Sequence, residues 1–283
     1  MNSSKVKETV LHILFAVCAC MSILAVLTIC VYLFASGIPA IAKIGVGDFL
    51  LGTKWKPSSG FFGILPMIVG SVLVTGIAIL IGVPLGVLCA VFMSHYCPKG
   101  LYRFVKPAIN LLAGIPSIVY GFFGLVVIVP LMKNLFGSGK SILTAGILLG
   151  IMILPTIIKT SETSLNAVPK SYYEGSLALG ATHERSVFFA SLPAAKSGIL
   201  AAIILGVGRA IGETMAVVMV AGNQTKLPDS LTDGVRTLTS NIVIEMGYAS
   251  GLHREALIAT AVVLFVFILI INLCFSVLKR RKD

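Results

Sequence analysis

The sequence contains few charged residues, and acidic residues are the scarcest of them. Its 283 residues include 11 Asp or Glu against 22 Lys or Arg, and charged residues make up 12% of the chain. Hydrophobic residues make up 57%, and the mean hydropathy is +1.01. A soluble globular domain carries about twice that charged fraction. The composition therefore excludes an ordinary soluble domain and predicts a membrane protein.

The sequence also lacks metal-binding patterns. Its six cysteines form no C-x-x-C pair and no Cys/His spacing typical of a metal site, and most of them lie within apolar runs. We interpret them as small packing residues. The histidines are dispersed along the chain, at His12, His95, His183 and His253. We therefore assign no metal site and no cofactor.

Long apolar runs are abundant. A helix of roughly 20 apolar residues spans the hydrocarbon core of a membrane. Six runs approach or exceed this length, at residues 10–35, 62–95, 104–132, 141–158, 192–222 and 256–278. They predict an all-α, polytopic membrane protein with about six transmembrane helices. Pro84, Pro116 and Pro155 lie inside these runs and are candidate points where a span bends or breaks.

The distribution of Lys and Arg predicts the orientation, because cytoplasmic flanks retain positive charge during insertion. The larger set of basic residues at the ends of the runs comprises Lys5, Lys7, Lys99, Arg103, Lys106, Lys159, Lys170, Arg185, Lys196 and the tail 279–282. Both termini and the polar stretch 159–191 are therefore predicted to be cytoplasmic. The loops around Trp55 and Thr232 are predicted to be external. Because the basic residues form no single stripe, the sequence does not favour nucleic-acid binding.

A short glycine-rich stretch, GSGKS at residues 137–141, resembles the end of a nucleotide-binding P-loop. The full pattern fails, because Asn134 occupies the place of the leading glycine. The stretch also lies between two predicted spans on the external side. We predict a turn, with Ser141 capping the helix that follows.

Two opposite charges, Arg209 and Glu213, lie four residues apart in the apolar stretch 206–223. An Arg at the centre of a spanning helix costs roughly 2.5–3.5 kcal/mol on insertion scales, so it normally faces a polar path or a partner. On a continuous helix the two residues share one face, which predicts an ion pair when the path is empty. The alternative is a structural salt bridge between helices.

The polar stretch contains the segment EGSLALGATHERSVFFASLP at residues 174–193. It resembles the EAA loop of ABC importer permeases, the short helix and turn that dock into the cytoplasmic ATPase. The residues that match are Glu174, Gly175, Ser176 and Gly180. The alternative is an amphipathic helix on the lipid headgroups, which the nearby aromatic residues also suit.

Four further blocks extend the resemblance: FFGILPMIVGS (61–71), LLAGIPSIVYGFFGL (111–125), TAGILLGIMILPTI (144–157) and GRAIGETMAVVMVAGN (208–223). Together they resemble the PstC-type permease of the bacterial phosphate ABC importer. The sister PstA-type permease tends to have GETAPL where Met215 follows Thr214 here. The alternatives are an ABC permease for sulfate or molybdate, and a secondary anion transporter or channel.

The resemblance implies a type I, MetI-like permease fold in the bacterial inner membrane, with no enzymatic activity of its own. It implies as partners a PstA-type sister permease, a cytoplasmic ATPase dimer, an external phosphate-binding protein, inorganic phosphate and membrane lipid. Arg209, Glu213 and Thr214 would line the substrate path. The expected organisation is a first span and external loop (1–61), a permease domain (62–278) with its coupling helix near 168–185, and a basic tail (279–283).

Overall fold

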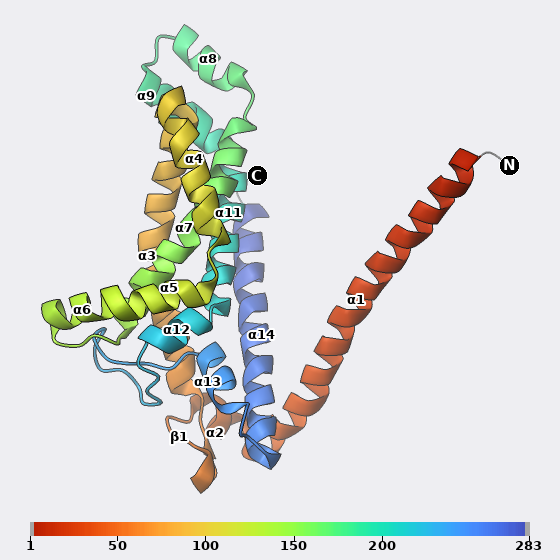
Figure 1. Cartoon of the computed structure of the whole chain (residues 1–283), viewed down its shortest axis with the longest axis vertical. Coiled ribbons are helices and arrows are strands. Elements are labelled where there is room, and N and C mark those ends of the chain that lie inside the picture. Colours follow the sequence, from red (N-terminus) through yellow and green to blue (C-terminus); the bar gives the residue numbers. More distant parts are fainter. Residues whose placement is uncertain (1–2, 281–283) are drawn as a thin grey trace.

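The computed structural model describes residues 3–280, and most of these residues lie in helices (Figure 1). The long helices are α1 (Ser3–Ile44), α3 (Leu65–Val91), α7 (Ile142–Asn166), α11 (Lys196–Gly212) and α14 (Gly251–Arg280). The predicted all-α, polytopic architecture is confirmed. Of the expected basic tail, residues 279 and 280 still belong to α14, and 281–283 lie outside the described residues.

Shorter elements connect the long helices. On the side of the first loop they are α2 (Val46–Leu51), β1 (Trp55–Lys56), η1 (Pro57–Ser59) and β2 (Phe61–Phe62). The middle of the chain adds η2 (Phe92–Tyr96), α4 (Lys99–Gly114), α5 (Ser117–Phe123), η3 (Gly124–Ile128) and α6 (Val129–Phe136). The remaining elements are α8 (Lys170–Ala178), α9 (His183–Ser186), η4 (Val187–Ser191), α10 (Leu192–Ala194), α12 (Met215–Val220) and α13 (Leu238–Glu245). Strands β1 and β2 pair in antiparallel fashion, with Trp55 opposite Phe62.

The described residues contain five helices that are long and apolar enough to cross a membrane. A sixth candidate is the pair His183–Ala194 and Lys196–Gly212, which is bent by 70° at its break. When the bent pair is counted as one span, the number of candidate spans agrees with the six apolar runs of the sequence.

The third predicted span, 104–132, is not one straight helix. Helix α4 ends at Gly114, Ile115 is extended (ψ 126°), and α5 begins after Pro116. Proline has no amide hydrogen and disfavours helical geometry at the residue before it, which explains the break. Beyond it, α5 and α6 run across the long axis of the bundle (Figure 1). Helices α3 and α7, in contrast, continue through Pro84 and Pro155.

The core of the bundle is the contact between α3 and α7, where glycines allow close approach. A Cβ atom on Gly82 would lie 2.7 Å from the side chain of Ile153, and one on Gly86 would lie 2.7 Å from Ile157. Gly146 of α7 is equally close to Ile77 of α3. Small residues that admit a neighbouring side chain are the usual basis of helix packing in membranes. The pair α3 and α7 therefore forms the rigid frame of the fold.

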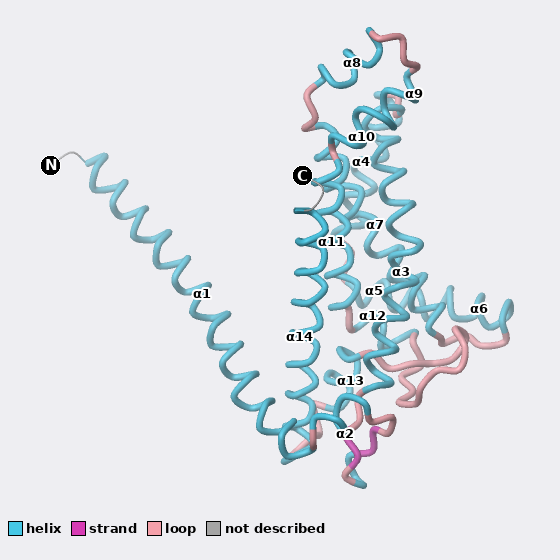
Figure 2. Tube along the Cα trace, turned by 180° about the vertical axis from the view of Figure 1, so that it is seen from behind, coloured by secondary structure: helices cyan, strands magenta, loops and turns pink. Residues whose placement is uncertain are grey.

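Helix α1 diverges from the bundle and contacts it mainly near its own C-terminal end (Figures 1 and 2). There, the rings of Phe34 and Phe265 are 5.8 Å apart, edge to face. Gly37 admits Val262 of α14 at the same junction. The two ends of the described chain and α8 lie toward one end of the molecule, and the hairpin and α13 lie toward the other (Figure 2).

The glycine-rich stretch 137–141 is a turn between α6 and α7. Gly137 has a left-handed backbone (φ 77°) and ends α6. The Ser141 side chain accepts a hydrogen bond from the Thr144 amide at 3.2 Å and caps α7. The predicted turn and cap are confirmed.

Candidate functional site

The helix that carries Arg209 ends before Glu213. Helix α11 stops at Gly212, and Glu213 has an extended backbone (ψ 133°). Helix α12 starts at Met215 and runs only to Val220. The fifth predicted span, 192–222, is therefore broken. The expectation of one continuous helix face for Arg209 and Glu213 is wrong, because Glu213 lies beyond the last helical residue.

Arg209 is half-buried and points to a neighbouring helix. Its Nη1 atom donates a hydrogen bond of 3.1 Å to Oγ1 of Thr156 in α7. Tyr120 of α5 lies within electrostatic reach of the guanidinium, and its hydroxyl donates to the Leu112 carbonyl at 2.8 Å. The bond to Thr156 thus joins α11 to α7 at the positive charge of Arg209. A guanidinium has five N–H donors, so most of them are not used within the described chain.

The charge of Arg209 has no carboxylate partner in the described residues. The four ion pairs there are Lys43–Glu255, Lys106–Glu162, Arg236–Glu245 and His253–Glu245. The predicted ion pair between Arg209 and Glu213 is therefore not formed.

Glu213 stabilises the helix break instead. Its carboxylate accepts a hydrogen bond from the Ala216 amide at 3.3 Å, which caps the first turn of α12. Its backbone carbonyl accepts a bond of 3.1 Å from the hydroxyl of Thr239 in α13. The hydroxyl of Thr214 donates to the Gly212 carbonyl at 3.2 Å. The three predicted path residues therefore lie at one helix break, but no bond joins Arg209 to the other two.

Gly206 places Arg209 beside Thr156. A Cβ atom on Gly206 would lie 3.0 Å from the side chain of Ile157, so α11 approaches α7 closely at this level. Arg209 follows three residues later, nearly one turn along the helix. Thr156 was not identified from the sequence, because it is a small polar residue inside an apolar block. The only available signal was its position directly after Pro155.

The predicted coupling helix is α8, and it lies at the extreme end of the molecule (Figure 1). None of its residues is buried, and Glu174 and Gly175 are exposed. Ser176 is half-buried and accepts a hydrogen bond of 3.0 Å from the hydroxyl of Ser186. Among the four predicted coupling residues, Glu174 and Gly175 are thus exposed, and Ser176 anchors α8 to α9.

The turn after α8 depends on Gly180. Its backbone is left-handed (φ 84°), a conformation that residues other than glycine rarely adopt. Leu179 beside it is 92% exposed. The chain then enters α9, where the Thr182 side chain accepts from the Arg185 amide. The sharp turn predicted at Gly180 is confirmed. Leu179 at this turn is exposed on the surface.

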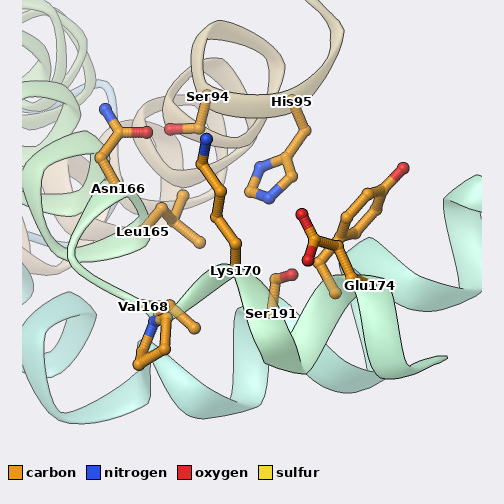
Figure 3. A pocket seen from close by; sticks show the side chains of 10 residues that line it. Ser94, His95, Leu165, Asn166, Val168, Lys170, Glu174 and Ser191 are labelled. Carbon is orange, nitrogen blue, oxygen red and sulfur yellow. The ribbon is translucent and has the colours of Figure 1, made fainter. Parts of the chain in front are cut away.

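A cavity of about 310 Å³ lies between α8 and the end of α3 (Figure 3). Lys170 and Glu174 of α8 face Ser94 and His95 of the π-helical turn η2 across it (Figure 3). Nearby, the Tyr173 hydroxyl and His183 Nδ1 share a hydrogen bond of 2.6 Å. The rings of Tyr173 and His95 are 6.1 Å apart, so α8 also packs against η2, which follows α3.

The described part of the chain contains no group of three or more His, Cys, Asp or Glu side chains arranged to hold a metal ion. The candidate site is Arg209 with the hydroxyl of Thr156, together with the exposed α8.

Residues 82–283 match the family model of the binding-protein-dependent transport system inner membrane component. The probable ABC transporter permease protein YqgH of Bacillus subtilis is 40% identical, and the match covers 94% of this chain and 89% of that protein. The phosphate transport system permease protein PstC of Haemophilus influenzae is 36% identical over 80% of this chain and 78% of that protein.

Solved structures of ABC importers share the fold. A chain of a bacterial ABC transporter involved in import of the acidic polysaccharide alginate gives a TM-score of 0.66 at 13% identity, covering 98% of this chain and 99% of that chain. A chain of the inward-facing MetNI methionine ABC transporter gives a TM-score of 0.64 at 20% identity, covering 81% and 100%. The MetI-like fold expected from the sequence is confirmed. Since the family model also covers most of its length, the chain belongs to the binding-protein-dependent transport system inner-membrane components, the permease subunits of ABC importers.

Proposed function

We propose that this chain is the permease subunit of an ATP-driven importer of inorganic phosphate, in which Arg209 binds the anion. The observation that carries the proposal is a half-buried guanidinium with no carboxylate partner in the described chain, held by Thr156 at a helix break. The similarity to a protein named as a phosphate permease supports the choice of anion.

The chemistry of Arg209 suits a phosphate group. A guanidinium stays charged at any physiological pH, and its planar fork of N–H donors matches two phosphate oxygens. With Thr156 occupying only one donor, the remaining donors are free for the anion. Partial burial strengthens the attraction, because fewer water molecules screen the charges. Phosphate would thus neutralise Arg209 during its passage.

Glu213 and Thr214 have supporting roles in this proposal. Glu213 keeps α12 separate from α11 by capping its first amide groups, so the two half-helices meet the path at their ends. Thr214 adds a hydroxyl at the same point. A broken helix that brings polar backbone to a substrate path is a recurrent arrangement in transporters.

The family implies a multi-pass inner-membrane protein that works with an ATPase and a substrate-binding protein. We further propose that a PstA-type permease supplies the other half of the path, and that a dimer of ATPase subunits docks on α8 through Glu174, Gly175, Ser176 and Gly180. Both termini and α8 would lie in the cytoplasm, opposite a phosphate-binding protein. In this arrangement 62–278 is the permease domain, and the exposed apolar surface of α1 contacts lipid or the sister subunit.

The test is uptake by the complete complex in proteoliposomes. ATP and the loaded binding protein should drive accumulation of radiolabelled phosphate, and excess unlabelled sulfate or molybdate should not reduce it. A complex that assembles with its ATPase but accumulates sulfate or molybdate in preference to phosphate contradicts the proposal. Uptake driven by an ion gradient without any ATPase supports a secondary transporter instead.

A further inference from the structure

Lys159 lies inside a helix rather than at its flank. The apolar run predicted a span that ends at residue 158, with Lys159 as a cytoplasmic flanking charge. In the structure α7 continues to Asn166. Lys159 is therefore seven residues before the end of α7, about 10 Å along the axis at 1.5 Å per residue. At this level the adjacent Ile158 packs against Ile109 and Met93, so the backbone of Lys159 lies beside an apolar cluster.

The other faces of α7 are occupied at this level. Ile153 and Ile157 pack on glycines of α3 and α11. Glu162 is buried on the side of α4, where it accepts hydrogen bonds from Tyr102 and Lys106. Lys159 lies about 160° around the helix from Ile157 but only about 60° from Glu162. The two oxygens of the Glu162 carboxylate are already bonded to Tyr102 and Lys106.

The face left open is polar along two turns of α7. Thr156, Lys159 and Thr163 follow one another at helical spacing, and none of them is buried. Thr156 is the residue that holds Arg209. The Thr163 hydroxyl donates a hydrogen bond of 2.9 Å to the Lys159 carbonyl, so this contact engages the Lys159 backbone and not its ammonium group. A polar face on a membrane helix is expected to border a water-filled path or a partner subunit.

Lys159 differs from the other lysine at this level of the bundle. Lys106 forms an ion pair with Glu162. The Lys159 side chain takes part in none of the ion pairs and hydrogen bonds found in the described residues. An unpaired ammonium group within a membrane span is costly unless water or an anion reaches it.

We propose that Lys159 is a second anion-binding residue of the substrate path, on the α8 side of Arg209. This inference rests on the proposed phosphate transport. The anion would pass from the guanidinium of Arg209, which is bonded to Thr156, to the ammonium group of Lys159. Lys159 lies three residues, or about 4.5 Å, beyond Thr156 along α7. Lysine binds phosphate as a point charge without a rigid bidentate fork. It attracts the anion out of the Arg209 site and still releases it to the cytoplasm.

The competing explanation is that the long Lys159 side chain reaches the lipid headgroups and only anchors the helix. The two explanations differ in what removal of the charge affects. An anchor would affect insertion and the amount of assembled complex. A path residue affects the transport rate of a complex that is fully assembled.

The first experiment compares variants of the full complex in proteoliposomes, with labelled inorganic phosphate as the probe. Lys159→Gln should assemble with its partners and lower the maximal uptake rate roughly tenfold or more, the effect of losing a hydrogen bond to a charged group. Lys159→Arg should retain most of the rate. Lys99→Gln, which removes an exposed lysine at the start of α4, is the matched control and should transport like the parent.

A chemical rescue keeps the test decisive if Lys159→Gln assembles poorly. Lys159→Cys should be slow until treatment with 2-aminoethyl methanethiosulfonate, which attaches an ammonium group through a disulfide and should restore uptake. The parent complex, which retains its six cysteines, receives the same treatment as a control. Phosphate should protect the new cysteine from an anionic thiosulfonate reagent.

Arg209→Gln in the same assay separates the two proposals. If Arg209→Gln abolishes uptake while Lys159→Gln and untreated Lys159→Cys transport at the parent rate, the role of Lys159 is refuted and phosphate transport stands. If Arg209→Gln also transports at the parent rate, the proposed function of the site is refuted, and the role of Lys159 that rests on it is refuted too.

Discussion

The indole nitrogen of Trp55 donates a hydrogen bond of 2.9 Å to Oε2 of Glu245, a residue 190 positions later in the chain. The same carboxylate pairs with Arg236 at 2.5 Å and with His253 at 2.8 Å. These contacts join the β hairpin, α13, α14 and the loop before α13 at the end of the molecule opposite α8. Glu245 therefore ties together the hairpin, α13 and α14 at this end of the molecule.

This cluster should weaken in acid. Burial raises the pKa of Glu245, but the hydrogen bonds from Trp55, His253 and Arg236 outweigh it and hold the pKa below the usual 4.5. A carboxyl group whose pKa is depressed on folding contributes stability above its unfolded pKa and loses it as the pH falls through the folded value. The cluster should thus be intact from pH 7 to about pH 5 and open below pH 4.5.

The measurement uses the single tryptophan of the chain. The difference in fluorescence between the parent complex and a Trp55→Phe complex isolates the emission of Trp55. This difference should stay constant down to about pH 5 and shift in wavelength below pH 4.5. A shift centred between pH 6 and 7 would mean that a group other than Glu245 controls the cluster.

Glu245→Gln should lower the thermal stability of the complex at neutral pH. Gln keeps the size of the side chain but leaves Arg236 without its carboxylate partner, and removing a partner of a buried charged group costs about 1–3 kcal/mol. The midpoint of thermal unfolding, measured in detergent at pH 7, should fall. Glu255→Gln, which removes the partner of the exposed Lys43, is the matched control and should leave the midpoint nearly unchanged.

Gly180→Val should uncouple ATP hydrolysis from uptake. A β-branched residue in the left-handed conformation costs roughly 1–2 kcal/mol, so the turn after α8 should shift. Gly180→Asn should be milder, because Asn tolerates this conformation better. Gly100→Val, at an exposed helical position with open space around it, is the control. Parallel assays of ATPase activity and phosphate uptake decide the outcome, and a coupled Gly180→Val complex contradicts the docking role of α8.

The orientation can be tested with single cysteines in a background that lacks the six native ones and still transports. Thr232→Cys should react with a membrane-impermeant thiol reagent added outside, and Lys170→Cys only after the membrane is opened. The reason is that the charge distribution places these segments on opposite faces. Reversed labelling would show that α8 faces outward and cannot meet a cytoplasmic ATPase.

Much of the fold could be predicted from the sequence, because apolar length fixes which segments can span a membrane. The Ser141 cap and the turn at Gly180 were also predictable, since each depends on a local residue preference. The direction of α5 and α6 after Pro116 was not predictable. Pro116 marked a candidate break, but both halves of that run are apolar, and apolarity does not fix the direction of the chain after a break.

The site was predicted in composition but not in geometry. Spacing alone suggested that Arg209 and Glu213 pair, which requires a continuous helix. The break is instead stabilised by Thr239, which comes from α13 and bonds to the Glu213 carbonyl. The partner of Arg209, Thr156, is 53 positions away and comes from another helix. Contacts of this kind depend on tertiary packing and leave no local pattern in the sequence.

The account centres on Arg209 as the anion-binding charge, independent of Glu213. The most direct measurement is the initial rate of ATP-driven phosphate uptake by three complexes, Glu213→Gln, Arg209→Gln and the double variant, each at matched amounts of assembled subunits. The account predicts that Glu213→Gln keeps substantial uptake, because an amide oxygen can still cap α12. Arg209→Gln and the double variant should both lose tenfold or more, as expected from losing a charge-assisted contact worth about 1.5–3 kcal/mol. Parent-like uptake in the double variant would contradict the account, because it would mean that the two charges serve only to balance each other.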